Sequence, residues 1–290
     1  MSQMRSALAY TPRPGRLQAA APTAALVYIF APALVAFLFS NPIVLAGTGA
    51  ASAVAGLKSG ARGALALVLR WGVALGLMIA AVNVLVNHRG DTVLVRGFDV
   101  PVLGQLDVTL ESLAAGGVLA LRIVVVMLAF AVYSACVDPD RVLALLRPFA
   151  GRSAMTATLI SRMAPLAIAD HARLREASSL RGPAAAPVGR GALARRIVAG
   201  SLDRAVDVAA TLELRGYALG PGRVAPLRRR SRHDRRFIAA AVAIAALGVA
   251  ARIAGVGDFE TFPALSLDAG PATFGLALVL PLIAWLPFHD

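Results

Sequence analysis

The sequence predicts an all-α integral membrane protein of about six transmembrane helices, with a cytosolic helical domain inserted before the last two. Hydrophobic residues make up 58% of the 290 residues and charged residues only 16%. The mean hydropathy is +0.71, which excludes an ordinary soluble domain. Charge is also segregated, because nineteen of the 29 Lys and Arg residues lie within residues 138–236. Arginine concentrated between apolar segments is typical of a cytosolic loop.

Six apolar stretches are long enough, or nearly so, to cross a bilayer core, which needs about 20 helical residues. The first ends at Ser40-Asn41-Pro42, a turn signal. Between the third and fourth stretches, the polar and Val-containing segment 87–105 predicts a small strand-like loop. The predicted spans are residues 21–39, 43–57, 64–86, 108–137, 237–254 and 272–287.

The distribution of Lys and Arg predicts the orientation of these spans. Basic residues precede the first span and follow the second, at Lys58 and Arg62. The loops after the third and fifth spans carry more acidic than basic residues. The positive-inside rule therefore predicts that both termini and the basic insert face the cytoplasm. A signal peptide is the alternative for the first span, but the later spans favour a retained helix. The predicted domains are residues 1–137, 138–236 and 237–290.

The basic insert is predicted to form helices separated by breaks. Asp138-Pro139-Asp140 is typical of a helix start, with acidic residues in the first turn. A short helix over residues 141–149 and a longer one over residues 153–180 follow, and Pro165 is expected to break the apolar stripe of the second. A linker rich in Ala, Pro and Gly spans residues 183–191, before a last helix over residues 192–214.

Two matching tripeptides end the two longer helices of the insert: Leu180-Arg181-Gly182 and Leu214-Arg215-Gly216. Glycine just beyond a helix permits the left-handed conformation that closes it. The preceding arginine then projects at the tip, with a planar guanidinium suited to a carboxylate. A single such arginine is best explained as a complement to its own helix's carbonyl end, worth about 0.3–1 kcal/mol. Two copies 34 residues apart favour a docking role instead.

The insert resembles the coupling domain of the transmembrane T component of energy-coupling factor (ECF) transporters, the EcfT/CbiQ family. That family carries two X-Arg-X motifs, most often Ala-Arg-Gly, which match the two tripeptides except that both begin here with Leu. Further similar positions are the Arg-x-x-Pro element, the acidic residue before each motif and the aromatic residue after the second. These positions are Arg162, Pro165, Glu176, Glu213 and Tyr217.

The resemblance implies a coupling subunit of a bacterial or archaeal cell membrane. Its expected partners are two cytosolic ABC ATPase subunits, docked by Arg181 and Arg215, and a membrane S component that binds a vitamin or a metal ion such as cobalt. The chain itself is expected to be no enzyme and to bind no cofactor, metal or nucleic acid. It contains no Gly-x-x-x-x-Gly-Lys-Ser/Thr phosphate loop, hydrolase motif or zinc spacing, and Cys136 is its single cysteine.

Arg122 is a further candidate, because it falls inside the fourth predicted span. Glu111 lies three turns earlier on a similar helical face. A charge within the membrane is a functional-site hypothesis, and contact with a partner such as the S component is one interpretation of Arg122. Snorkelling to the interface is the alternative.

Two other functions remain open from the sequence. A permease subunit of a conventional ABC importer is the first, because Glu176-Ala177-Ser178 with Gly182 resembles the start of that family's coupling loop. A conventional permease, however, has one such loop. The second is a membrane-anchored scaffold whose basic insert binds lipid or nucleic acid. The aromatic residues expected among the basic ones for single-strand binding are missing.

Overall fold

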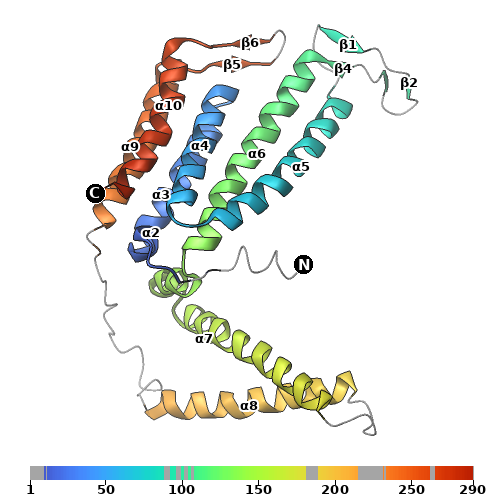
Figure 1. The fold of residues 1–290 in the computed structure, drawn as a ribbon, viewed down its shortest axis with the longest axis vertical. Coiled ribbons are helices and arrows are strands. Elements are labelled where there is room, and N and C mark those ends of the chain that lie inside the picture. The colour runs from blue at the N-terminus through green and yellow to red at the C-terminus, as the bar shows by residue number, and fades with distance from the viewer. Residues whose placement is uncertain are drawn as a thin grey trace. The chain divides into compact units, whose positions relative to one another are not determined.

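The computed structural model describes residues 10, 12–87, 92–95, 99–100, 104–105, 108–180, 189–214, 231, 233–261 and 265–289. The chain divides into two compact units. We call Met1–Pro139 together with Arg229–Asp290 the membrane unit, and Asp140–Arg228 the inserted unit. The inserted unit thus begins two residues after the start of the predicted insert. Figure 1 shows the fold of both units.

The membrane unit is built from apolar helices that correspond to the six predicted spans. Among the described residues, four of these helices are long and apolar enough to cross a membrane: α5, α6, α9, and α10 taken together with the short 3-10 helix η2. Helices α3 and α4 are apolar but shorter, with 17 residues each. The bounds are α2 Arg16–Ala19, α3 Pro22–Leu38, α4 Pro42–Lys58, α5 Arg62–Val86, α6 Leu110–Cys136, α9 Asp234–Ile253, α10 Pro271–Trp285 and η2 Leu286–Phe288. The prediction of an all-α membrane protein is confirmed.

Short antiparallel strands occupy two connections of the membrane unit. The connection between α5 and α6 contains the predicted strand-like loop, in which β1 pairs with β4 and β2 with β3. The connection between α9 and α10 holds β5 and β6, which the sequence analysis did not anticipate. Figure 1 shows both sets of strands beyond the same end of the helices. The strands are β1 Val93–Val95, β2 Asp99–Val100, β3 Gly104–Gln105, β4 Val108–Thr109, β5 Phe259–Glu260 and β6 Ser266–Leu267.

Glycine allows the helices of the membrane unit to approach closely. A Cβ atom added to Gly47 in α4 would lie 2.5 Å from the carbonyl oxygen of Ala277 in α10. One added to Gly248 in α9 would lie 2.7 Å from a methyl group of Val35 in α3. Small residues at helix contacts are typical of membrane proteins, because association there depends on close packing. The helices α3, α4, α9 and α10 therefore form a tightly packed frame.

The start of α9 is tied to the start of α3 by Asp234. Its two carboxylate oxygens accept hydrogen bonds from the backbone amides of Ala21, at 2.7 Å, and Ser231, at 3.0 Å. Near the same end of the unit, the hydroxyl of Tyr28 in α3 donates to the carbonyl of Ala284 in α10. The bonds made by Ala21 and Tyr28 join segments that are more than 200 residues apart in sequence.

The inserted unit consists of α7 (Pro139–Ser179) and α8 (Arg190–Leu214). The Ser161 hydroxyl donates to the Asp140 carboxylate at 2.5 Å. In a straight helix these residues would lie about 31 Å apart, so α7 must fold back between them. The prediction of separate helices over residues 141–149 and 153–180 is wrong in one respect, because helical structure continues through residues 150–152 and the chain changes direction without leaving the helix. Pro165 lies inside α7, as the predicted helix over residues 153–180 required, because proline removes one backbone hydrogen bond while those on either side hold the helix.

Candidate coupling site

The helix α7 ends one residue before its predicted docking motif, and α8 ends at the first residue of its motif. Leu180 follows α7 and Leu214 is the last residue of α8, with 80% and 89% of their surfaces exposed. At the end of α7, the carbonyl of Glu176 accepts from the Leu180 amide at 3.2 Å and from the Ser179 hydroxyl at 2.7 Å. Exposed leucines of this kind are available to a partner. The motif residues Arg181, Gly182, Arg215 and Gly216, together with Tyr217, lie outside the described residues.

The supporting residues predicted from the sequence are distributed along both helices. Arg162 and Pro165 lie within α7, at least 14 residues before its end, and the Pro165 ring is exposed. Glu176 and Glu213 are also exposed, and each lies in the last turn of its helix. The structure therefore brings Glu176 and Glu213 to the two helix ends, while Arg162 and Pro165 stand apart from them.

An ion pair between Asp170 and Arg204 joins α7 to α8. The Arg204 guanidinium bonds the Asp170 carboxylate and also donates through Nε to the carbonyl of Gly200 at 3.0 Å. Arg173 approaches the same carboxylate at 3.9 Å. The side chains of Asp170 and Arg204 are 27% and 31% exposed, so the pair is partly shielded from water. This contact was not predicted from the sequence, although the two residues repeat the 34-residue spacing of the motifs.

A largely apolar cavity of about 500 Å³ lies beside this ion pair. Its α7 side comes from residues before Asp170, and its α8 side comes mostly from residues after Arg204. Its lining is Thr156, Leu159, Ile160, Met163, Ala167, Ser201, Arg204, Ala205, Val208, Ala209 and Leu212. The residues of α7 that precede Asp170 therefore face the residues of α8 that follow Arg204. The two helices thus cross in an antiparallel sense. Figure 1 shows this crossing within the inserted unit.

The crossing places the two motif-bearing ends symmetrically. Leu180 follows Asp170 by ten residues (180 − 170), and Leu214 follows Arg204 by ten residues (214 − 204). At 1.5 Å per residue, each end extends about 15 Å beyond the ion pair. Because the helices run in opposed directions, the two ends lie on opposite sides of the crossing. This arrangement presents two separate, equivalent contact points.

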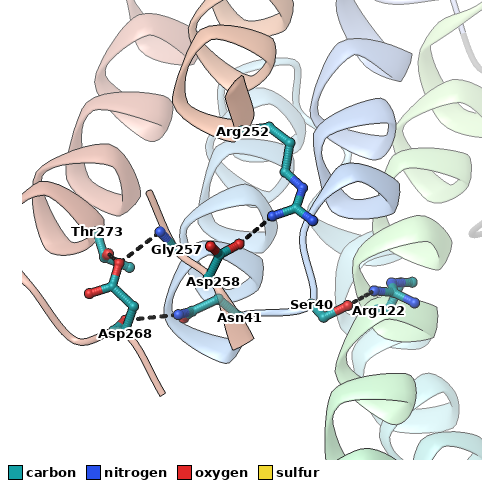
Figure 2. A network of polar contacts seen from close by, with 8 residues as sticks. All are labelled: Ser40, Asn41, Arg122, Arg252, Gly257, Asp258, Asp268 and Thr273. Atoms are coloured by element: carbon teal, nitrogen blue, oxygen red, sulfur yellow. Dashed lines mark hydrogen bonds and ion pairs between the residues drawn. The ribbon is translucent and has the colours of Figure 1, made fainter. Parts of the chain in front are cut away.

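Arg122 binds the end of a neighbouring helix within the membrane unit. Its Nε donates to the carbonyl of Ala36 at 3.0 Å, and its Nη2 donates to the carbonyl of Phe39 at 2.9 Å and the hydroxyl of Ser40 at 3.0 Å. The last carbonyls of a helix have no intrahelical partner and carry its negative dipole end. Arg122 therefore caps α3, as Figure 2 shows for its contact with Ser40. Glu111 does not pair with it.

Asp268 forms a second polar cluster, on the other side of the α3–α4 turn (Figure 2). Its carboxylate accepts from the amides of Gly257, at 2.8 Å, and Gly270, at 3.0 Å, and from the hydroxyl of Thr273 at 2.8 Å. These bonds hold the pKa of Asp268 below its usual range, and the bond from the Gly257 amide contributes most. The carbonyl of Asp268 accepts from the side chain of Asn41 at 2.9 Å. The Asp-Ala-Gly-Pro sequence before α10 was the available signal for this cluster.

The fold defines a multi-pass helical membrane protein that carries an inserted pair of crossing helices. The profile of the CbiQ family, described as cobalt transport protein, matches residues 16–225, which is most of the chain and includes both motifs. The chain belongs to the CbiQ family and is a membrane transport component. No curated protein matches it.

Proposed function

We propose that this protein is the T subunit of an ECF-type ABC importer, which couples two cytosolic ATPase subunits to a substrate-binding membrane subunit. The observation that carries the proposal is the pair of exposed helix ends at equal distances from the Asp170–Arg204 crossing. Each end leads directly into an Arg-Gly sequence. Two equivalent ends on opposite sides of one crossing suit two similar partners better than one.

In the proposed mechanism, each helix end docks on one ATPase subunit. Arg181 and Arg215 supply guanidinium groups that pair with carboxylates or carbonyls of the two ATPases. Leu180 and Leu214, which are largely exposed, contribute apolar contact. When the ATPases move on ATP binding and hydrolysis, α7 and α8 change their crossing. That movement is passed to the membrane subunit that holds the substrate.

The chain itself is neither ATPase nor substrate receptor in this proposal. Hydrolysis takes place in the ATPase subunits, and selectivity resides in the S component, which binds a vitamin or a metal ion. The family description names cobalt, so cobalt is the first substrate to test. The apolar helices keep this subunit in the cell membrane with both termini in the cytoplasm.

Charge reversal at both motifs tests the proposal. We expect the Arg181→Glu, Arg215→Glu double variant to lose co-purifying ATPase subunits and substrate uptake. Truncating one partner of an interfacial charge pair costs about 2–5 kcal/mol, and reversal adds repulsion. The matched control is Arg175→Glu with Arg195→Glu, which makes the same charge change at exposed positions of α7 and α8. The control should retain both ATPases.

The single variants separate this proposal from a conventional permease with one coupling loop. We expect Arg181→Glu and Arg215→Glu each to weaken ATPase binding, because each removes one of two contacts. If only one of the two variants has an effect, the single-loop permease is favoured. Undiminished ATPase co-purification and uptake in the double variant would contradict the proposed coupling role.

A further inference from the structure

Arg70 is an exposed cation within an apolar helix. It lies in α5, whose apolar length qualifies it as a membrane span, and its side chain is exposed. The hydrocarbon core of a bilayer is spanned by about 20 helical residues. If these are the last 20 residues of α5, which ends at Val86, they begin at residue 67, and Arg70 lies about one turn inside the hydrocarbon region. In the described part of the chain, no hydrogen bond or ion pair reaches Arg70 or Arg62. An uncompensated charge at this depth is unfavourable, which points to an anion supplied from outside the chain.

The direction of α5 lets Arg70 reach the membrane surface. Side chains on a helix lean toward its N-terminus, and α5 begins at Arg62. The path of Arg70 toward that end passes Ala66 and Gly63, one and two turns earlier on nearly the same face. Both are exposed, and a Cβ atom added to Gly63 would meet nothing within 4 Å. The two small residues leave open surface between the two arginines, which we call the recess.

We propose that α5 binds the phosphate headgroup of an anionic phospholipid in this recess, between Arg62 and Arg70. The guanidinium of Arg70 approaches the phosphate from the hydrocarbon side and Arg62 approaches it from the aqueous side. Arginine binds phosphate oxygens through paired N–H donors. The site does not depend on ATPase docking.

The surroundings favour a lipid over free phosphate or a protein carboxylate. Beside and beyond Arg70 the exposed surface of α5 is apolar, with Leu69, Trp71 and Val73 between 43% and 53% exposed, as an acyl chain requires. The Arg62 end of α5 also lies beside the Cys136 end of α6, because the two helices are antiparallel neighbours with Gly76 against Ala120. The inserted unit follows that end of α6, and the cytoplasmic leaflet predicted there carries anionic lipid.

Trp71 offers a direct probe of this site, because the chain has only two tryptophans. In a Trp285→Phe background, the full chain is reconstituted in vesicles containing brominated phosphatidylglycerol or brominated phosphatidylcholine at equal mole fraction. We expect the anionic lipid to quench Trp71 with about fivefold higher apparent affinity, the effect of one cation near an anionic headgroup. Arg70→Leu should abolish this preference, and Arg62→Gln should weaken it. Arg235→Gln removes an exposed cation near the same membrane face and should leave it unchanged.

Several results would overturn the proposal. Equal quenching by the two lipids, or an unchanged preference in Arg70→Leu, means that the recess selects no anionic lipid. Loss of the preference on adding inorganic phosphate identifies free phosphate as the ligand. Loss on adding a membrane partner, with return on its removal, identifies a protein contact. Mass spectrometry of the lipids retained by the wild-type and Arg70→Leu chains supplies a second measurement that needs no Trp285 substitution, and we expect wild type to retain more phosphatidylglycerol.

Discussion

The membrane unit and the inserted unit differ in how their helices are held together. In the membrane unit, helices meet at glycines that admit no side chain, and many apolar residues are fully buried. In the inserted unit, no described residue is fully buried, and α7 meets α8 through the Asp170–Arg204 pair beside an open apolar cavity. Close packing resists deformation, whereas a crossing with one ion pair permits it. These contacts predict that the first unit is the more rigid of the two.

The contact at Gly47 provides the strongest test of the rigid frame. Gly47→Ala places a methyl group 2.5–2.6 Å from backbone atoms of Ala277, which cannot rotate away. We expect the unfolding free energy to fall by about 1–3 kcal/mol, as measured by thermal unfolding in detergent. The control Gly275→Ala adds a methyl group where nothing lies within 4 Å and should stabilise α10 by up to about 1 kcal/mol. Equal responses of the two variants would mean that α4 and α10 are not tightly packed.

Arg122 tests whether polar contacts also hold the frame. Arg122→Leu leaves the carbonyls of Ala36 and Phe39 without their donor, and we expect it to cost about 2 kcal/mol in unfolding free energy. Arg122→Lys should show an intermediate loss, because one ammonium group cannot reproduce the planar fork. Arg235→Leu, which removes an exposed arginine of α9 that makes no described bond inside the chain, serves as the control and should leave stability unchanged. If Arg122→Leu unfolds like wild type but loses a co-purifying membrane subunit, Arg122 acts as a partner contact instead.

The positions of the helices could be predicted from the sequence, whereas several of the polar contacts between them could not. The helices of the frame could be located within a few residues because a membrane span has a fixed length and composition. The ends of α7 and α8 could be predicted because glycine marks helix ends. The partner of Arg122 could not be predicted, because its bonds are to backbone carbonyls of α3, which carry no sequence signal. The same reason applies to the bond that Asp268 accepts from the backbone amide of Gly257, whereas Asp-Ala-Gly-Pro marks the local bond that it accepts from Gly270.

Asp268 should make the α9–α10 connection sensitive to acid. Its folded-state pKa is lowered, mainly by the Gly257 amide and then by Thr273 and Gly270. A lowered folded-state pKa gives stability that is present above the unfolded pKa of about 3.9 and is lost as pH falls through the folded pKa. We expect the thermal midpoint of the wild type to fall below about pH 4 more steeply than that of Asp268→Asn. Parallel pH profiles of the two proteins would exclude this role.

The Asp170–Arg204 pair should have the smallest effect on stability and a larger effect on geometry. Both groups are partly exposed, so a double-mutant cycle with Asp170→Asn and Arg204→Gln should give a coupling free energy of about 0.2–1 kcal/mol.

Each variant should nevertheless broaden the distribution of distances between spin labels at Leu180→Cys and Leu214→Cys in a Cys136→Ala background. Each helix end extends about 15 Å beyond the crossing, so a small rotation there displaces both labels. Arg175→Gln, at an exposed position of α7, is the control and should leave the distribution unchanged. An equally narrow distribution in all variants would show that another contact fixes the crossing, and that the inserted unit is as rigid as the frame.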